Sequence, residues 1–237
     1  MRLFGKRPVN ERLKANPQTI RKIFIERGFS DEEILKLARK RKIFVEKVDD
    51  RRFYKLTRGL NTQGIVAEAE DFFYDDFDEL ISLDDPKKPV LVFLDEVTDP
   101  QNLGSIMRTL SCLGGFCIIL PKRDSVGVNE TVLRVASGAE NYIPVCQVSN
   151  LSNAIQKAKK AGYWIAATVV EKGQNPRSAG LRFPLGIIFG SEGEGIRLIL
   201  ERQADYRLTL PMKGAGLSFN VAIAAAVFCY EIASQRH

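Results

Sequence analysis

The sequence has few of the residues on which many enzyme classes depend. Its one histidine, His237, is the last of 237 residues, so acid–base catalysis by histidine and a histidine-ligated metal site are not leading hypotheses. No apolar run reaches the ~18 residues typical of a membrane-spanning helix. The N-terminal stretch MRLFGKRPVNERLK has no apolar signal-peptide core. We therefore expect a cytoplasmic protein that uses no metal.

The cysteines also argue against several site types. None of the four forms a Cys-x-x-Cys pair, which disfavours a zinc site or a redox-active disulfide. Three of them fall in segments that we expect to be buried, where cysteine acts as a small apolar residue. The four positions are Cys112, Cys117, Cys146 and Cys229.

Two familiar phosphate-binding patterns are missing as well. Neither G-x-G-x-x-G nor G-x-x-x-x-G-K-[ST] occurs in the chain. The glycine-rich segment FGSEGEGI (189–196) carries Glu192 and Glu194, which disfavour a phosphate and suit a bound cation or amine. A nucleotide held by either of the two usual loops is therefore excluded.

Positive charge is concentrated near the N-terminus. Residues 1–60 contain 18 Lys and Arg against 8 Asp and Glu, whereas residues 61–88 contain 2 against 9. The basic block favours a polyanionic partner, most simply nucleic acid, although a solvated helix face also explains part of it. The acidic stretch at 70–89 predicts a boundary. We expect domains at 1–75 and 89–237, joined by a linker at 76–88.

Strands and helices are predicted to alternate on both sides of this boundary. Before it, strands at 21–26, 42–48 and 64–70 enclose a helix that begins at Ser30, where Glu33 would complete a capping box, and a short helix that ends at Gly59. This pattern predicts a small α/β domain with a parallel or mixed sheet.

After the boundary, the strands are almost continuously apolar. Such strands with intervening helices predict a parallel sheet covered on both faces, and ligands bind such sheets beyond the carboxyl ends of the strands. The predicted strands are 90–97, 116–121, 142–148, 163–170, 185–192 and 206–211, and the helices are 103–114, 129–139, 151–161, one from Ile196 and one at the C-terminus.

Three loops at the ends of these strands have unusual compositions. In DEVTDPQNLGSIMR (95–108), Asn102 is placed to cap a helix and Arg108 to point back towards the loop. The second loop is FGSEGEGI, and the third is LPMKGAGLSFNVA (210–222), where Ser218 or Asn220 can cap the last helix. Each loop alone fits an ordinary turn or a capped helix. Their occurrence at the edge of one sheet favours a shared site.

The combination of N-x-G-x-x-x-R (102–108), FGSEGEGI and LPMKGAGLSFNVA resembles the three motifs of the SpoU/TrmH family. These proteins are RNA ribose 2′-O-methyltransferases of the trefoil-knotted SPOUT class. The segment TRGLNTQGIVAEAE (57–70) resembles the strand-entry segment of their small, L30e-like substrate-binding domain. The resemblance implies an α/β fold with a knotted parallel-sheet C-terminal domain and a small N-terminal α/β domain. It also implies S-adenosylmethionine as cofactor and a homodimer that completes the active site.

The resemblance also implies roles for particular residues. The cofactor-binding positions are Thr168, Gly190, Leu210, Met212 and Phe219, and Phe219 stands where the family usually has leucine. The active-site positions are Asn102, Arg108, Glu192, Ser218 and Asn220. The family often assigns Arg108 as the base, but its pKa above ~12 makes it a reluctant one. We expect Arg108 to hold a substrate phosphate or to stabilise the developing alkoxide.

The resemblance points to RNA as substrate, and the separate N-terminal domain favours ribosomal RNA, most simply 23S. Unpaired or looped RNA is expected, because a ribose inside a regular duplex is hard to bring to a buried methyl donor. In-line methyl transfer needs no metal, histidine or cysteine nucleophile. Alternatives that stay open are a transfer RNA or resistance methyltransferase, a non-catalytic RNA-binding relative and a small-molecule α/β enzyme.

Overall fold

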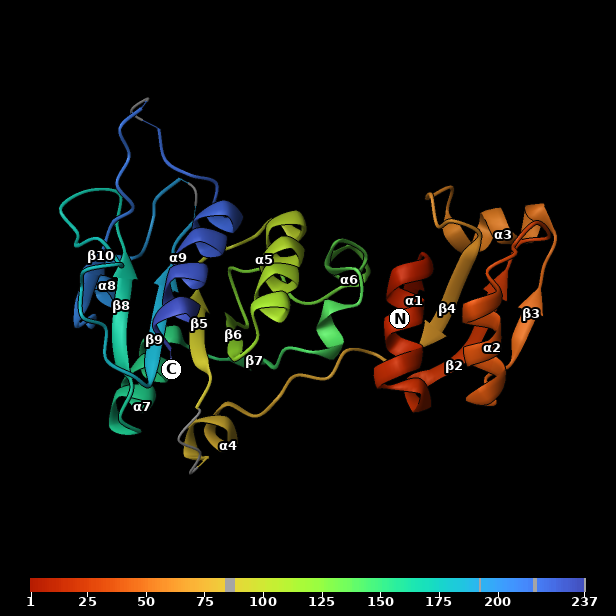
Figure 1. The fold of residues 1–237 in the computed structure, drawn as a ribbon, viewed down its shortest axis with the longest axis horizontal. Helices are drawn as coiled ribbons and strands as arrows, with labels where there is room; N and C mark the ends of the chain where they lie inside the picture. The colour runs from red at the N-terminus through yellow and green to blue at the C-terminus, as the bar shows by residue number, and fades with distance from the viewer. Residues whose placement is uncertain (84–87, 192, 215–216, 237) are drawn as a thin grey trace. The chain divides into compact units, whose positions relative to one another are not determined.

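The computed structural model describes residues 1–83, 88–191, 193–214 and 217–236. The chain divides into two compact units (Figure 1). Unit 1 contains Met1–Phe73 and Val128–Asn141, and unit 2 contains Tyr74–Gly127 and Tyr142–His237. The chain therefore returns to unit 1 once after entering unit 2.

A four-stranded mixed sheet forms the centre of unit 1. Its order is β1-β4-β2-β3, with β4 antiparallel to both β1 and β2, and β2 parallel to β3. The strands are β1 (Arg2–Phe4), β2 (Ile20–Ile25), β3 (Val45–Lys47) and β4 (Ile65–Ala69).

Helices cover both faces of this sheet. One core joins Ile23 of β2 to Leu13, Ile34 and Leu133, and a second core on alternate strand residues includes Phe24. The elements in unit 1 are α1 (Lys6–Ala15), η1 (Pro17–Thr19), α2 (Glu32–Lys40), α3 (Asp50–Thr57), α6 (Glu130–Ala136) and η2 (Ala139–Asn141). The presence of Leu133 in the first core explains why the segment with α6 belongs to this unit.

Unit 2 is built on a six-stranded sheet in which every neighbouring pair is parallel. The order is β10-β8-β9-β5-β6-β7. The strands are β5 (Val90–Leu94), β6 (Phe116–Pro121), β7 (Val145–Val148), β8 (Trp164–Thr168), β9 (Leu185–Phe189) and β10 (Tyr206–Leu208). All residues of β5, β6 and β9 are buried, as expected for a sheet covered on both faces.

The helices of unit 2 form a layer on each face. Phe77, Ile155 and Leu200 of α4, α7 and α8 join a core with alternate residues of the strands. On the other face, α5 and α9 lie side by side (Figure 1), and Phe228 of α9 packs edge-on against Phe189 of β9. The helices are α4 (Phe77–Ser82), α5 (Pro100–Leu113), α7 (Leu151–Lys160), α8 (Leu198–Glu201) and α9 (Val221–Gln235).

The predicted α/β fold, with a parallel-sheet C-terminal part and a small N-terminal α/β part, is confirmed. The trefoil knot stays a prediction. Two helix starts were wrong. Asp31 caps α2 in place of Ser30, and Asp99 caps α5, which places Asn102 inside the first turn of that helix. The strand β1 and the helix α1 were not predicted.

The cysteines are distributed as the sequence indicated. Cys117, Cys146 and Cys229 are buried and Cys112 is exposed, all four as free thiols. Within the described ranges, no helix has the length and apolar character needed to cross a membrane.

Candidate active site

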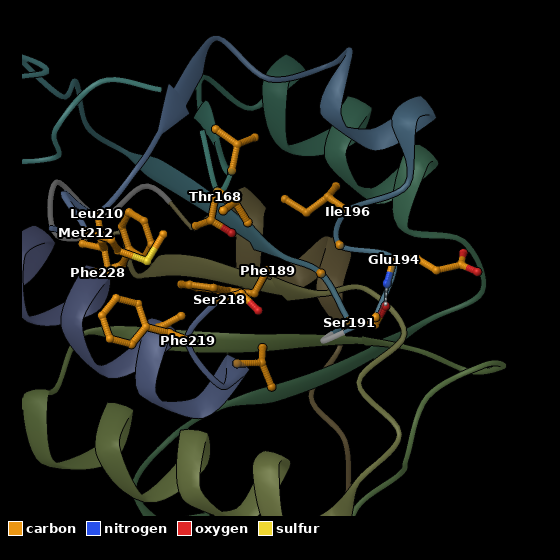
Figure 2. A pocket seen from close by; sticks show the side chains of 17 residues that line it. Thr168, Phe189, Ser191, Glu194, Ile196, Leu210, Met212, Ser218, Phe219 and Phe228 are labelled. Carbon is orange, nitrogen blue, oxygen red and sulfur yellow. Dashed lines mark hydrogen bonds between the residues drawn. The ribbon is translucent and has the colours of Figure 1, made fainter. Parts of the chain in front are cut away.

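A cavity of about 270 Å³ lies at the carboxyl edge of the unit 2 sheet (Figure 2). Its walls come from the loops that follow β8, β9 and β10, through Thr168, Gly190 and Leu210. The entry to α9 supplies Phe219, and the helix itself supplies Phe228. The carboxyl ends of parallel strands meet at one edge, so residues far apart in sequence come together there.

The lining of this cavity is mainly apolar and carries no positive charge among the described residues. In Figure 2, Met212 and Phe219 lie to one side and Glu194 to the other, with Thr168 and Ser218 between them. A cavity without Lys, Arg or His in its described lining suits a flat apolar group better than a phosphate. The exposed carboxylate of Glu194 is compatible with a ligand that carries a positive charge.

The loop after β9 folds back tightly over Gly190. A Cβ atom at this position would lie 2.0 Å from the backbone carbon of Gly195, so only glycine fits without moving the backbone. The turn is closed by two hydrogen bonds, from Ser191 N to Gly195 O at 3.2 Å and from Gly195 N to Ser191 O at 3.1 Å. The glycines of FGSEGEGI therefore have different uses, since a Cβ at Gly193 would meet nothing within 4 Å.

A buried aspartate, which was not among the predicted site residues, anchors the same loop. Asp95 directly follows β5 and is fully buried. Its carboxylate accepts hydrogen bonds from Arg197 N at 3.0 Å and Arg197 Nε at 2.9 Å. The pKa of Arg197 is raised, mainly because its side chain donates hydrogen bonds to Asp95. An acidic residue directly after a fully apolar strand was the available signal, because a buried charge needs a partner.

A smaller cavity of about 180 Å³ adjoins the first, and the two share Ser191, Gly193 and Val221. Its other walls come from the loop after β5 and from Asn102 on α5. Asn102 is buried, and its Oδ1 accepts a hydrogen bond from Asn220 Nδ2 at 3.0 Å. The Oδ1 atom of Asn220 accepts from Ala222 N at 2.9 Å, so Asn220 caps α9 and ties it to α5.

The structure brings most of the expected site residues together. Ser218 and the five expected cofactor positions line the first cavity, while Asn102 lines the second and Asn220 lies beside it. Arg108 lies on an exposed part of α5 and lines neither cavity. Glu192 lies outside the described residues. The roles assigned to these residues stay predictions.

The contribution of α9 to the cavity wall was missed. Val221, Ala224 and Phe228 are spaced three and four residues apart, so they share one helix face and line the cavity together. The sequence motifs pointed only to the loop before this helix. This spacing could have indicated a cavity-lining face. The helix is apolar on most sides, however, so the side that lines the cavity does not stand out in the sequence. Among the described residues, no group of His, Cys, Asp and Glu is placed to hold a metal ion.

Residues 89–230 match the model of the SpoU rRNA Methylase family, and residues 2–74 match a model described as RNA 2′-O ribose methyltransferase substrate binding. The chain therefore belongs to the SpoU family of RNA methyltransferases, which confirms the resemblance found in its motifs. A putative TrmH family tRNA/rRNA methyltransferase from Bacillus subtilis, YacO, is 32% identical over 99% of this chain and 96% of its own. An uncharacterized tRNA/rRNA methyltransferase from Synechocystis is 40% identical over 81% of this chain, which spans only 50% of that relative.

Solved structures of related proteins share the fold. The SpoU methyltransferase AviRb from Streptomyces viridochromogenes, in complex with AdoMet, superposes with a TM-score of 0.82 at 23% identity and covers 100% of this chain and 90% of its own. An AdoMet-bound rRNA methyltransferase from Sinorhizobium meliloti gives a TM-score of 0.81 at 24% identity, over 99% of this chain and 86% of its own. At these identities the likeness establishes the fold.

Proposed function

We propose that this protein transfers the methyl group of S-adenosylmethionine to a ribose 2′-hydroxyl of RNA, with 23S ribosomal RNA as the first candidate substrate. The observation that carries the proposal is the pair of adjoining cavities at the carboxyl edge of the unit 2 sheet. One suits an apolar, cationic ligand, and the other is lined by hydrogen-bonding side chains. AdoMet in the related structures is consistent with this division.

The first cavity would hold the cofactor. The apolar side chains Leu210, Met212 and Phe219 offer surfaces for an adenine ring. The hydroxyl of Thr168 donates to Ile188 O at 2.9 Å, so its proton is already used to join β8 to β9. The Thr168 hydroxyl can therefore only accept from a ligand, and any donor at this strand end would be a backbone group. The cofactor supplies an activated methyl group on a sulfonium sulfur.

The second cavity would receive the target ribose. Thr98 offers a hydroxyl to sugar hydroxyls, and Asn102, which accepts a hydrogen bond from Asn220, forms part of the wall. The 2′-oxygen would form a bond to the methyl carbon while the carbon–sulfur bond breaks. The electron pair of the broken bond would stay on sulfur. The hydroxyl proton leaves to solvent. Alignment of the two reactants in adjoining cavities supplies most of the required rate enhancement.

Arg108 would act on the RNA as a cation and not as a base. Its position on the exposed part of α5, outside both cavities, fits a residue that meets a phosphate of the substrate. Replacing Arg108 with lysine tests this role. We expect kcat to fall while the affinity for S-adenosylmethionine is unchanged. Activity equal to the wild type would contradict any need for the planar guanidinium group.

A homodimer would complete the site. The face of α9 that carries Ile223, Val227 and Tyr230 is apolar and partly exposed, with exposed fractions of 53%, 39% and 62%. These residues are spaced by four and three, so they form one stripe on the helix. Ile223→Asp should give monomers in light scattering, whereas Ile199→Asp on α8 is a matched exposed control. The cytoplasmic location expected from the sequence stays a prediction.

The direct test is methyl transfer with purified components. The protein is incubated with labelled S-adenosylmethionine and, in separate reactions, 23S transcript, assembled large subunits and transfer RNA. Labelled nucleotides that resist alkaline cleavage on their 3′ side identify 2′-O-methylation. Label in transfer RNA alone would favour the alternative substrate. Binding of RNA without binding of the cofactor in calorimetry would favour a non-catalytic RNA-binding relative.

A further inference from the structure

Unit 1 has a cavity of its own, of about 520 Å³, which is not part of the methyl-transfer site. Its lining comes from three segments that are far apart in the sequence. Lys6 and Arg7 lie at the start of α1, and Arg134 lies on α6. Asn61 and Gln63 precede β4, inside the segment TRGLNTQGIVAEAE that the sequence analysis singled out.

The charge of this cavity is not balanced by the residues around it. None of its described lining residues is acidic. The ammonium group of Lys6 lies 3.2 Å from a carboxylate oxygen of Asp31. The guanidinium groups of Arg7 and Arg134 have no ion pair or hydrogen bond with any described residue. Two unpaired guanidinium groups at one cavity favour an anion from outside the protein.

Hydrogen bonds fix the walls that carry the uncharged donors. Gln63 Oε1 accepts from Lys6 N at 3.3 Å, and Asn61 Oδ1 accepts from Gln63 N at 3.2 Å. Both amide oxygens are therefore occupied. The Nδ2 and Nε2 groups of these residues have no acceptor among the described residues, so they are available as donors. The cavity thus combines two cations and two amide donors with no described carboxylate in its lining.

We propose that this cavity binds a backbone phosphate of the RNA substrate and the nucleotide attached to it, which rests on RNA being the substrate under the proposed function. A guanidinium group can hold two phosphate oxygens at once, and side-chain amides donate to phosphate and sugar oxygens.

The test measures affinity for a 23S ribosomal RNA transcript by filter binding across a salt series. The variants are Arg7→Gln, Arg134→Gln and the double variant. Arg39→Gln is the matched control, because Arg39 on α2 has a 71% exposed side chain and lies outside the cavity lining. Arg134→Lys keeps the charge and reports on the planar group. Circular dichroism melting checks that each variant is folded.

We expect each cavity variant to bind RNA about fivefold more weakly at low salt. The slope of log affinity against log salt should become shallower by about 0.7 for each lost contact with single-stranded RNA. Arg39→Gln should change neither quantity. Affinity for S-adenosylmethionine, measured by calorimetry, should be the same in all variants, because the cofactor cavity lies in unit 2.

The outcomes separate this proposal from the proposed function. If the double variant is folded and binds RNA with wild-type affinity and slope, the cavity proposal is overturned, even where the wild type transfers methyl groups. If the wild type binds no RNA, it is overturned as well. If RNA binding falls as expected but the wild type transfers no methyl group, the cavity proposal is supported and the proposed reaction is wrong.

Discussion

The two units line their cavities with opposite chemistry. The cavity in unit 1 has Lys6, Arg7 and Arg134 in its lining. The cofactor-type cavity in unit 2 has no basic residue among its described lining, and Glu194 is the acidic residue described there. The difference shows that the lining of the unit 1 cavity favours an anion through its charge, whereas the mainly apolar unit 2 cavity selects its ligand mainly through its shape.

The largest effect is expected from removing the positive charge of Arg12, which is buried in unit 1. Arg12 Nη2 lies 3.2 Å from Glu140 Oε1, and the two side chains are 8% and 0% exposed. Arg12→Met leaves the carboxylate buried without a counter-charge, which should lower the free energy of unfolding of unit 1 by about 3 kcal/mol. Urea denaturation at neutral pH measures this loss, and Arg39→Met is the exposed control.

The same variant has a predicted pH dependence. Burial raises the pKa of Glu140, and Arg12 opposes part of that rise. A carboxyl group with a raised pKa in the folded state favours folding at low pH, and this stability is lost as the pH rises through the folded pKa. Without Arg12 the pKa of Glu140 rises further. The stability deficit of Arg12→Met should therefore be larger at pH ~8 than at pH ~5. An equal stability deficit at both pH values would contradict this prediction.

The importance of shape in unit 2 is tested at Gly190. A Cβ at this position would clash with the backbone of Gly195, so Gly190→Ala must open the turn that walls the cavity. We expect affinity for S-adenosylmethionine to fall about 100-fold, or by about 2.7 kcal/mol. Gly193→Ala is the matched control in the same loop, because its Cβ would meet nothing within 4 Å. Equal losses in calorimetry would mean that flexibility of the loop matters more than the close approach.

Sequence patterns predicted the sheet in unit 2 well for a physical reason. Strands buried on both faces are almost purely apolar, as in VLVFL (90–94), and they stand out between amphipathic helices. Loops at the carboxyl ends of parallel strands lie at one edge of the sheet. The family resemblance pointed to Thr168, Gly190 and Leu210 in these loops, and all three line one cavity. Strands were predicted well where one composition pattern extends along the whole strand.

Other features depend on contacts that no local pattern reveals. The helix α6 has the same appearance as the helices of unit 2, yet Leu133 packs in the core of unit 1. Asp99 and Asn102 are both plausible caps, and the helix start at Pro100 decides between them, since proline fits the first helical position. The pair Asp95 and Arg197 joins residues 102 positions apart, so the place of Asp95 after an apolar strand could indicate the need for a partner but not that the partner is Arg197.

An intermediate effect is expected where α5 and α9 are joined. Asn220→Ala removes the cap of α9 and the hydrogen bond to Asn102, which should destabilise unit 2 by about 1 kcal/mol. Asn220→Asp keeps an acceptor for the cap and loses the amide donor, so it should cost less. Urea denaturation compares the two variants. A greater loss in Asn220→Asp would mean that repulsion between the new carboxylate and Asn102 Oδ1 outweighs the retained cap.

The smallest effect is expected at Glu194, where a single substitution removes the acidic charge described in the lining of the unit 2 cavity. The side chain is exposed, so screening limits its contribution to a cation to at most about 1 kcal/mol, or about fivefold in affinity. Glu194→Gln should weaken binding of S-adenosylmethionine by this factor and leave binding of the uncharged analogue methylthioadenosine unchanged. Glu171→Gln, also exposed but outside the lining, controls for the general field. An equal loss for both ligands would mean that Glu194 shapes the loop, and that the unit 2 cavity selects its ligand by shape alone.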